Sequence, residues 1–155
     1  MNQYSPLPLT LERLWQFSLQ HYSVRDIKEA CLHLQNHHQG NVNLILLLKW
    51  LDEHELAFSE DQWIQLETAI DRTQSLLSQF RYYRRKAKPH LPDTLYRESL
   101  QFELQLERQQ QSDLVTCLNQ LTLTPQQGIP MTHQYCLKQD AKHLCEHFYS
   151  TASRT

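Results

Sequence analysis

The residues of this chain that are best suited to binding chemistry form a basic cluster at positions 81–88, which read Arg-Tyr-Tyr-Arg-Arg-Lys-Ala-Lys. The i, i+3, i+4, i+7 spacing places four of its cations on one helix face, and these are Arg81, Arg84, Arg85 and Lys88. Cations bind phosphates and carboxylates, and the rings of Tyr82 and Tyr83 can stack on a planar group. We therefore expect these cations to project beyond the core into solvent and to contact an anionic surface. The simpler alternative is a solvated helix C-terminus, where the helix dipole favours positive charge.

The kind of partner follows from the rest of the chain. A net charge of -2 gives no general attraction to nucleic acid, so any attraction must be local. No helix-turn-helix pattern precedes the basic cluster, which argues against duplex DNA. We expect the acidic surface of a protein or of a ribonucleoprotein.

Histidines form a second group of candidate ligands, 9 in all. Two stretches have the same helical spacing, and their members are Asp26, Ala30, His33 and His37 in one and Cys136, Asp140, His143 and His147 in the other. Imidazoles at i and i+4 can share a metal ion, so the four histidines are candidate ligands if the two helices pack together. Alternatively, these residues border the buried face or form a pH-responsive surface. The chain lacks the Glu-x-x-His pairs of di-iron bundles.

An apolar helix at the centre of the fold must position these groups. Residues 41–51 read Asn-Val-Asn-Leu-Ile-Leu-Leu-Leu-Lys-Trp-Leu. A helix with so little polar surface must be covered by other helices on nearly every side. It is too short to cross a bilayer, which needs about 20 apolar residues. We expect it to span residues 41–55 in the middle of a bundle.

Capping signals define the helices before the central one. Thr10 can cap a first helix that runs to about Tyr22. Ser23 with Asp26 resembles a capping box that opens a second helix. Gly40, in the left-handed conformation, is expected to end that helix.

The second half of the chain predicts three further helices. A capping box beginning at Ser59 opens a long helix that includes the basic cluster. Another helix follows the prolines after it, with Leu100 and Leu104 on its buried side. Residues 107–113 contain no apolar side chain, so this run either projects into water or breaks the helix. Thr132 is expected to cap a single last helix.

These elements predict an all-α fold, a single-domain antiparallel bundle of about six helices over residues 10–152, preceded by an extended arm of residues 1–9. A chain of 155 residues fits one domain, and 2 glycines leave little material for hairpins or phosphate-binding loops. Four separated cysteines without a Cys-x-x-Cys pair are expected to be reduced. With no visible secretory signal, we expect a cytoplasmic protein that does not enter the membrane.

Three motifs stand out between residues 15 and 51. They read Trp15-x-Phe17-Ser18-Leu19-x-x-Tyr22, Ala30-Cys31-Leu32-x-Leu34-Gln35 and Gly40-Asn41-Val42-Asn43-Leu44, and a Trp50-Leu51 pair follows. In this order they resemble a family of small bacterial proteins known only as a domain of unknown function. The resemblance implies a helical fold and brings no established reaction, cofactor or partner.

Gln35 and Asn43 are polar residues of these motifs that lie close to the predicted core. Gln35 falls in the last turn of one helix, and Asn43 falls in the first turn of the next, which Asn41 caps. Polar side chains this close to a core must find hydrogen bonds. Either they tie the turn together through backbone bonds, or they form a ligand-binding patch at one end of the bundle.

The sequence thus predicts a non-enzymatic helical protein that docks on a macromolecular partner through the basic cluster. No strained nucleophile elbow or oxyanion loop argues for catalysis, and no cofactor is expected. The alternative is a small-molecule or metal-binding bundle centred on Gln35, Asn43 and the histidines. A homo-oligomer formed through the N-terminal arm is a third hypothesis.

Overall fold

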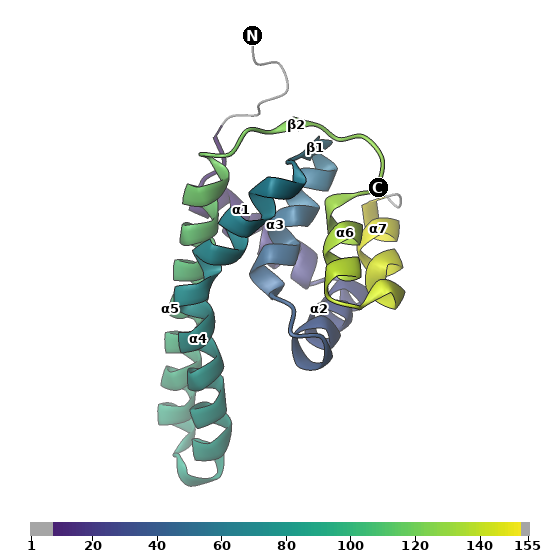
Figure 1. The fold of residues 1–155 in the computed structure, drawn as a ribbon. Helices are drawn as coiled ribbons and strands as arrows, with labels where there is room; N and C mark the ends of the chain where they lie inside the picture. Colours follow the sequence, from purple (N-terminus) through teal and green to yellow (C-terminus); the bar gives the residue numbers. More distant parts are fainter. Residues whose placement is uncertain (1–7, 153–155) are drawn as a thin grey trace.

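The computed structural model describes residues 8–152, with the side chains of residues 8–148. The fold is all-α, as predicted, and its helices are α1 (Leu11–Tyr22), α2 (Arg25–His37), α3 (Val42–Glu53), α4 (Trp63–Ala87), α5 (Asp93–Leu118), α6 (Met131–Lys138) and α7 (Cys145–Ala152). Figure 1 shows α3 in the middle, with the α4–α5 hairpin to its left and α6 and α7 to its right.

α3 is the central apolar helix. The side chain of Asn41 accepts a hydrogen bond from the Leu44 N–H over 2.7 Å, so the predicted N-cap is confirmed. Every residue from 43 to 51 is buried, because α1, α2, α5 and α6 all pack against this helix. Even Lys49 is only 1% exposed, and its ammonium donates to the backbone carbonyl of Phe148 over 2.8 Å.

The hydrogen bonds at the helix starts agree with prediction for α1 but not for α2. The Thr10 hydroxyl oxygen accepts from the Arg13 N–H over 3.2 Å and caps α1. The capping box predicted at Ser23 is wrong. Val24 is the N-cap of α2 and forms no side-chain hydrogen bond there. The Ser23 hydroxyl instead donates to the carbonyl of Gln20, at the end of α1.

The turn between α2 and α3 requires a glycine for space and not for backbone conformation. The left-handed residue after α2 is Gln39, with φ 56°, so the prediction of a left-handed Gly40 is wrong. A Cβ on Gly40 would lie 2.3 Å from Cγ of Leu34, a fully buried side chain. Gly40 therefore lets the chain pass directly over α2 into α3.

α4 and α5 form a long antiparallel hairpin whose far end extends beyond the other helices (Figure 1). The capping box predicted at Ser59 is present in a 3-10 turn (Glu60–Gln62) before α4. A second 3-10 turn (Lys88–His90) connects the two helices. The hairpin carries the basic cluster near this connection.

α5 is continuous, so the polar run at residues 107–113 is helical and does not break. It does not project into water either, since Gln110 and Gln111 are each 1% exposed and hydrogen-bonded in the core. Leu100 and Leu104, predicted to be buried, are 37% and 41% exposed. The far half of the hairpin lies beyond the bundle, where mainly α4 is available to cover α5.

The segment predicted as one last helix forms two helices, α6 and α7. The structure therefore has seven helices in its described residues where about six were predicted. A turn with left-handed Asp140 (φ 56°) and a 3-10 turn (Lys142–Leu144) separate them. Thr132 is not the N-cap of α6, because Pro130 occupies that position. The Thr132 hydroxyl donates instead to the carboxylate of Asp52, at the end of α3, over 2.7 Å.

Asp52 ties the segment after α5 to the central helix. Its carboxylate also accepts from the backbone N–H groups of Met131 and Thr132 and from the side chain of Gln126. Beside it, β1 (Leu56–Ala57) pairs antiparallel with β2 (Thr124–Pro125), a small sheet that the sequence pattern does not predict.

The predicted arm of residues 1–9 lies mostly outside the described residues. Within it, Leu9 is buried, and its carbonyl accepts from the side chain of Asn119 over 2.8 Å. From residue 8 to residue 152, every helix is too short or too polar to span a bilayer.

Candidate functional site

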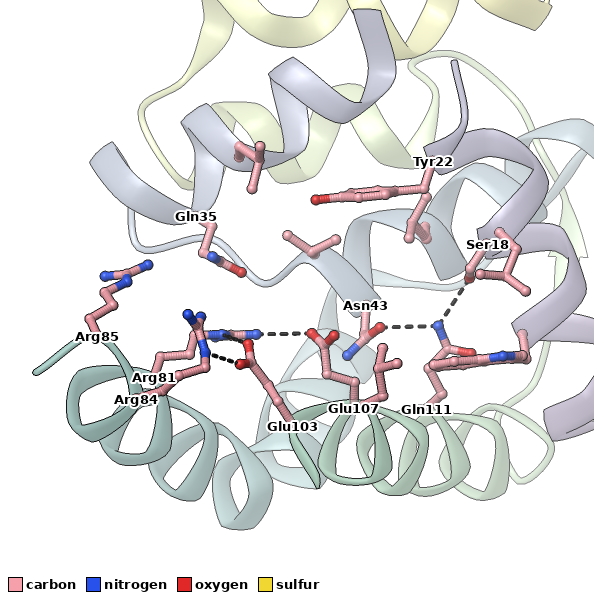
Figure 2. Close-up of a pocket in the computed structure, with 16 residues that line it drawn as sticks. Ser18, Tyr22, Gln35, Asn43, Arg81, Arg84, Arg85, Glu103, Glu107 and Gln111 are labelled. Carbon is pink, nitrogen blue, oxygen red and sulfur yellow. Dashed lines mark hydrogen bonds and ion pairs between the residues drawn. The ribbon is translucent and has the colours of Figure 1, made fainter. Parts of the chain in front are cut away.

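A pocket of about 280 Å³ opens where α1, α2 and the start of α3 face the α4–α5 hairpin (Figure 2). We call it the polar pocket, and its lining residues are Trp15, Ser18, Leu19, Tyr22, Leu32, Gln35, Val42, Asn43, Leu46, Arg81, Arg84, Arg85, Glu103, Leu104, Glu107 and Gln111. Three arginines of the basic cluster thus meet Gln35 and Asn43 around one hollow. The sequence suggests the basic cluster and the Gln35–Asn43 patch as alternative sites, and members of both line this one pocket.

Ion pairs between α4 and α5 form the charged side of the polar pocket. The Nε of Arg81 lies 3.2 Å from a carboxylate oxygen of Glu103, and its terminal nitrogen lies 2.9 Å from Glu107. Arg84 also pairs with Glu103 and donates to the hydroxyl of Tyr96 over 3.1 Å. The side chains of Arg81, Arg84 and Glu103 are only 13–14% exposed, so water screens these ion pairs less than ordinary surface pairs.

The polar pocket carries one positive charge in excess, since three arginines face two glutamates. Arg85 is the unpaired cation, because no ion-pair partner for it occurs among residues 8–152. Burial raises the pKa of Glu107, and the neighbouring Arg81 opposes that shift. The excess positive charge favours an anionic ligand over a cationic one.

Gln111 lies at the buried end of the polar pocket and has an unsatisfied carbonyl. Its amide nitrogen donates to the Ser18 hydroxyl and to the Asn43 side-chain oxygen, each over 3.0 Å (Figure 2). Its side-chain oxygen has no hydrogen-bond partner in the described part of the chain, although the residue is 1% exposed. Two other buried polar atoms, Nδ1 of His21 and Nε1 of Trp63, are unpaired in the same way and belong to residues that do not line the pocket.

Two further polar groups face the pocket without a hydrogen bond to any described residue. They are the side-chain amide of Gln35 and the hydroxyl of Tyr22. Burial, with Cys31 and Glu107 adding to it, raises the pKa of Tyr22 to about 12. The hydroxyl therefore stays protonated at neutral pH and can donate to a ligand.

The basic cluster divides into an inward and an outward part. We expected all of its cations to project beyond the core, which is wrong for Arg81 and Arg84, because they turn toward α5 and pair with its glutamates. Tyr82 and Tyr83 are 60% and 64% exposed, with ring centroids 5.5 Å apart, and neither lines the pocket. Lys88 is exposed at the outer end of the hairpin.

The two histidine stretches do meet, but not in the predicted combination. The ring centroids of His33 and His143 lie 5.4 Å apart, and His38 completes a triangle with them. His37 contacts His33 at 4.6 Å but lies outside the group of mutually close ligand atoms, as does His147. The reason is local: a 3-10 turn, not a continuous helix, carries His143.

The cysteines offer no activated nucleophile. Cys31, Cys117, Cys136 and Cys145 are free thiols. Burial raises the pKa of Cys31 to about 12, which leaves almost no thiolate at neutral pH. The polar pocket itself contains no cysteine. Its lining provides charged groups and hydrogen-bonding groups.

Several pocket residues were not predicted as site residues: Ser18, Tyr22, Glu103, Glu107 and Gln111. The spacing of Glu103 and Glu107 is i, i+4, which places two acids on one face opposite arginines of the preceding helix. That complementarity is a usable signal for pairing within a helical hairpin. No comparable signal marks Gln111, whose partners belong to α1 and α3.

Half of the lining residues belong to the motifs noted in the sequence, namely Trp15, Ser18, Leu19, Tyr22, Leu32, Gln35, Val42 and Asn43. No curated protein and no solved structure matches the chain. The model of a family described as proteins of unknown function (DUF2390) matches residues 13–114, which is about two thirds of the chain and includes every residue of the polar pocket. The chain therefore belongs to the DUF2390 family.

Proposed function

We propose that this protein binds a small organic anion in the polar pocket. The observation that carries the proposal is Arg85, a cation that lines the pocket next to Arg81 and Arg84 and has no ion-pair partner among the described residues. The site is concave and combines apolar walls with a few polar groups, as ligand sites commonly do.

The lining defines the class of ligand. Arg85, as the unpaired cation, attracts a carboxylate or phosphate group, and the protonated Tyr22 hydroxyl can donate to the same anion. The side-chain amide of Gln35, which faces the pocket, can bind a hydroxyl or an amino group of the ligand. Leucines on the opposite walls provide contact for a short carbon skeleton. At about 280 Å³, the hollow is at the small end of ligand pockets, which run to about 300–1,000 Å³.

A ligand screen tests this proposal. Ligand-observed NMR of the full chain against a library of small hydroxy acids, amino acids and phosphate esters is expected to give hits that Arg85→Gln weakens at least tenfold. Arg85→Gln breaks no ion pair within the described residues. Lys86→Gln is the matched control, because it removes the same charge one residue along from a side chain that does not line the pocket.

The hits are also expected to compete with one another for the pocket. A library without hits, or hits that bind Arg85→Gln and Lys86→Gln equally, would refute the proposal. Circular dichroism of each variant verifies that the helices remain folded.

A second candidate function is docking on an acidic protein or ribonucleoprotein surface through the outer end of the hairpin. It is favoured by the exposure of Tyr82 and Tyr83 and by the exposed Lys86, whose ammonium lies 5.5 Å from the Tyr82 ring centroid. Tyrosine is enriched in protein interfaces, and a cation attracts an acidic surface. This surface does not use the inward-facing Arg81 and Arg84.

Cross-linking and mass spectrometry in the native cell test the docking hypothesis. A Tyr82→Ala/Tyr83→Ala variant is expected to lose a captured partner while ligand binding in the pocket is unchanged. Ile64→Ala is the control, since Ile64 is a 62% exposed apolar residue near the other end of α4. Equal capture by the double variant and by the wild type would exclude the hairpin end as the docking surface.

A further inference from the structure

Three imidazole rings from two distant parts of the chain gather at one exposed site, away from the residues that line the polar pocket. His33 lies in α2, His38 directly follows α2, and His143 lies in the 3-10 turn between α6 and α7. The ring centroids of His33 and His38 are 5.3 Å apart, those of His33 and His143 are 5.4 Å apart, and those of His38 and His143 are 5.3 Å apart. The three rings therefore form a nearly equilateral triangle.

This triangle is somewhat wider than a three-histidine metal site with an ion bound. One ring nitrogen from each histidine lies within 4.8 Å of the others. Zinc bound at about 2.0–2.1 Å in a tetrahedron separates its ligand nitrogens by about 3.4 Å. The nitrogens need to approach by little more than one ångström. His33 and His143 are exposed and His38 is half-buried, so side-chain rotation alone can close that gap.

The backbone that carries the histidines is held in place. The His38 N–H donates to the carbonyl of Leu34 over 3.1 Å, at the end of α2. The side chain of Gln139 donates to the His38 carbonyl over 3.0 Å and so ties the turn after α6 to the turn after α2. Such support from neighbouring residues keeps metal ligands in register.

We propose that His33, His38 and His143 bind one divalent transition-metal ion, for which zinc is the best fit. Imidazole suits zinc, and a site with three histidines leaves a fourth position for water. His37 is not a ligand, because its ring packs against His33 outside the triangle. The ion would connect the part of the chain matched by the family model, residues 13–114, with His143 beyond it. This site is independent of the anion proposed for the polar pocket.

Metal titration of the full chain, produced without a histidine tag and stripped with a chelator, tests the proposal. Calorimetry with zinc chloride is expected to give one equivalent bound, and cobalt(II) is expected to give the strong visible absorption of a tetrahedral complex. His38→Ala and His143→Ala are each expected to weaken binding at least tenfold, whereas His37→Ala has a smaller effect. His90→Ala is the control, because it removes a histidine from the far hairpin turn.

Zinc is also expected to raise the melting temperature of the wild type but not of His143→Ala, which separates binding at this site from loose surface binding. Absence of stoichiometric binding would overturn the proposal. So would binding that survives His143→Ala, because that result would assign the metal to the pair of histidines on α2 alone.

Discussion

The side-chain amide of Gln111 donates a hydrogen bond to the side-chain oxygen of Asn43 over 3.0 Å, which connects α5 to the first turn of α3 inside the protein. Asn43 in turn donates to the side-chain oxygen of Gln110 over 2.9 Å. Both ends of the Asn43 amide are therefore used by α5. The hairpin is attached to the central helix by hydrogen bonds as well as by apolar packing, and these bonds stand at the edge of the polar pocket.

Replacing Asn43 should destabilise the protein without removing apolar contacts. In Asn43→Leu, the Gln110 oxygen and the Gln111 amide each lose a buried partner, so we expect a loss of about 1–3 kcal/mol in the free energy of unfolding. Equilibrium urea unfolding measures it. Asn36→Ala, at an exposed position of α2, is expected to change stability by less than about 0.5 kcal/mol. Equal effects of the two substitutions would contradict the role of Asn43.

Gly40→Ala tests the close passage of the chain over α2. The added methyl group would lie 2.3 Å from Cγ of Leu34, which is fully buried and cannot move aside freely. We expect destabilisation by about 1–3 kcal/mol from overpacking. In a double-mutant cycle with Leu34→Ala, the two effects should be less than additive, because the smaller side chain removes the clash. Strictly additive effects would mean that the clash is relieved elsewhere.

Lys49→Met tests how the C-terminal helix is held. The ammonium of Lys49 donates to the carbonyl of Phe148 over 2.8 Å and lies 3.4 Å from the Glu53 carboxylate. Methionine keeps the apolar part of the side chain and removes both contacts. We expect faster amide hydrogen exchange in α7 and little change in α3. Lys142→Met, at an exposed position, is the control.

Glu103 and Glu107 should respond differently to neutralisation. Glu103 pairs with both Arg81 and Arg84, so Glu103→Gln leaves two poorly solvated guanidinium groups, and we expect a loss of about 1–3 kcal/mol. Burial raises the pKa of Glu107, which means that folding disfavours its charged form. Glu107→Gln should therefore cost less at pH 7. Equilibrium urea unfolding measures the loss in both variants. A larger loss of unfolding free energy for Glu107→Gln than for Glu103→Gln would contradict the greater structural role given to Glu103.

Stability should fall in alkaline solution. Burial raises the pKa of Cys31 and of Tyr135 to about 12, from ordinary values of 9.0 and 10.0. Below pH 9, folded and unfolded chains both keep these protons, and the contribution to stability is complete. Between pH 9 and pH 12 the unfolded chain releases them first, so the free energy of unfolding decreases as pH rises. Unfolding titrations should show a shallower decline for Cys31→Ala, and an unchanged slope would contradict burial of this thiol.

Much of the fold could be predicted because its signals are local. The apolar run after Asn41 requires a covered helix, and Thr10 and Ser59 provide caps within three residues of their partners. Gly40 was assigned correctly to the turn but for the wrong reason. The sequence does not reveal that Leu34 approaches it so closely, since that contact depends on how α3 crosses α2.

The candidate site was less predictable because its contacts join distant residues. Arg81 was expected to face solvent, and only the register of the hairpin brings it to Glu103, 22 residues away. Gln111 lies within a polar run that is typical of an exposed helix, yet its partner Ser18 lies 93 residues away in α1. His38 was missed because it lies outside the i, i+4 pattern, and a turn rather than a helix face brings it to His143.

The anchoring of α6 by Asp52 has a practical consequence for work on fragments. α6 begins beyond residue 114, yet Met131, Tyr135 and Cys136 are buried in it and it packs along α3. In a fragment of residues 13–114, the side of α3 that α6 covers would be exposed to solvent. The Asp52 carboxylate would also lose the backbone N–H donors of Met131 and Thr132. Such a truncated product should self-associate. We therefore expect the smallest unit that folds by itself to extend past residue 114, where the family match ends.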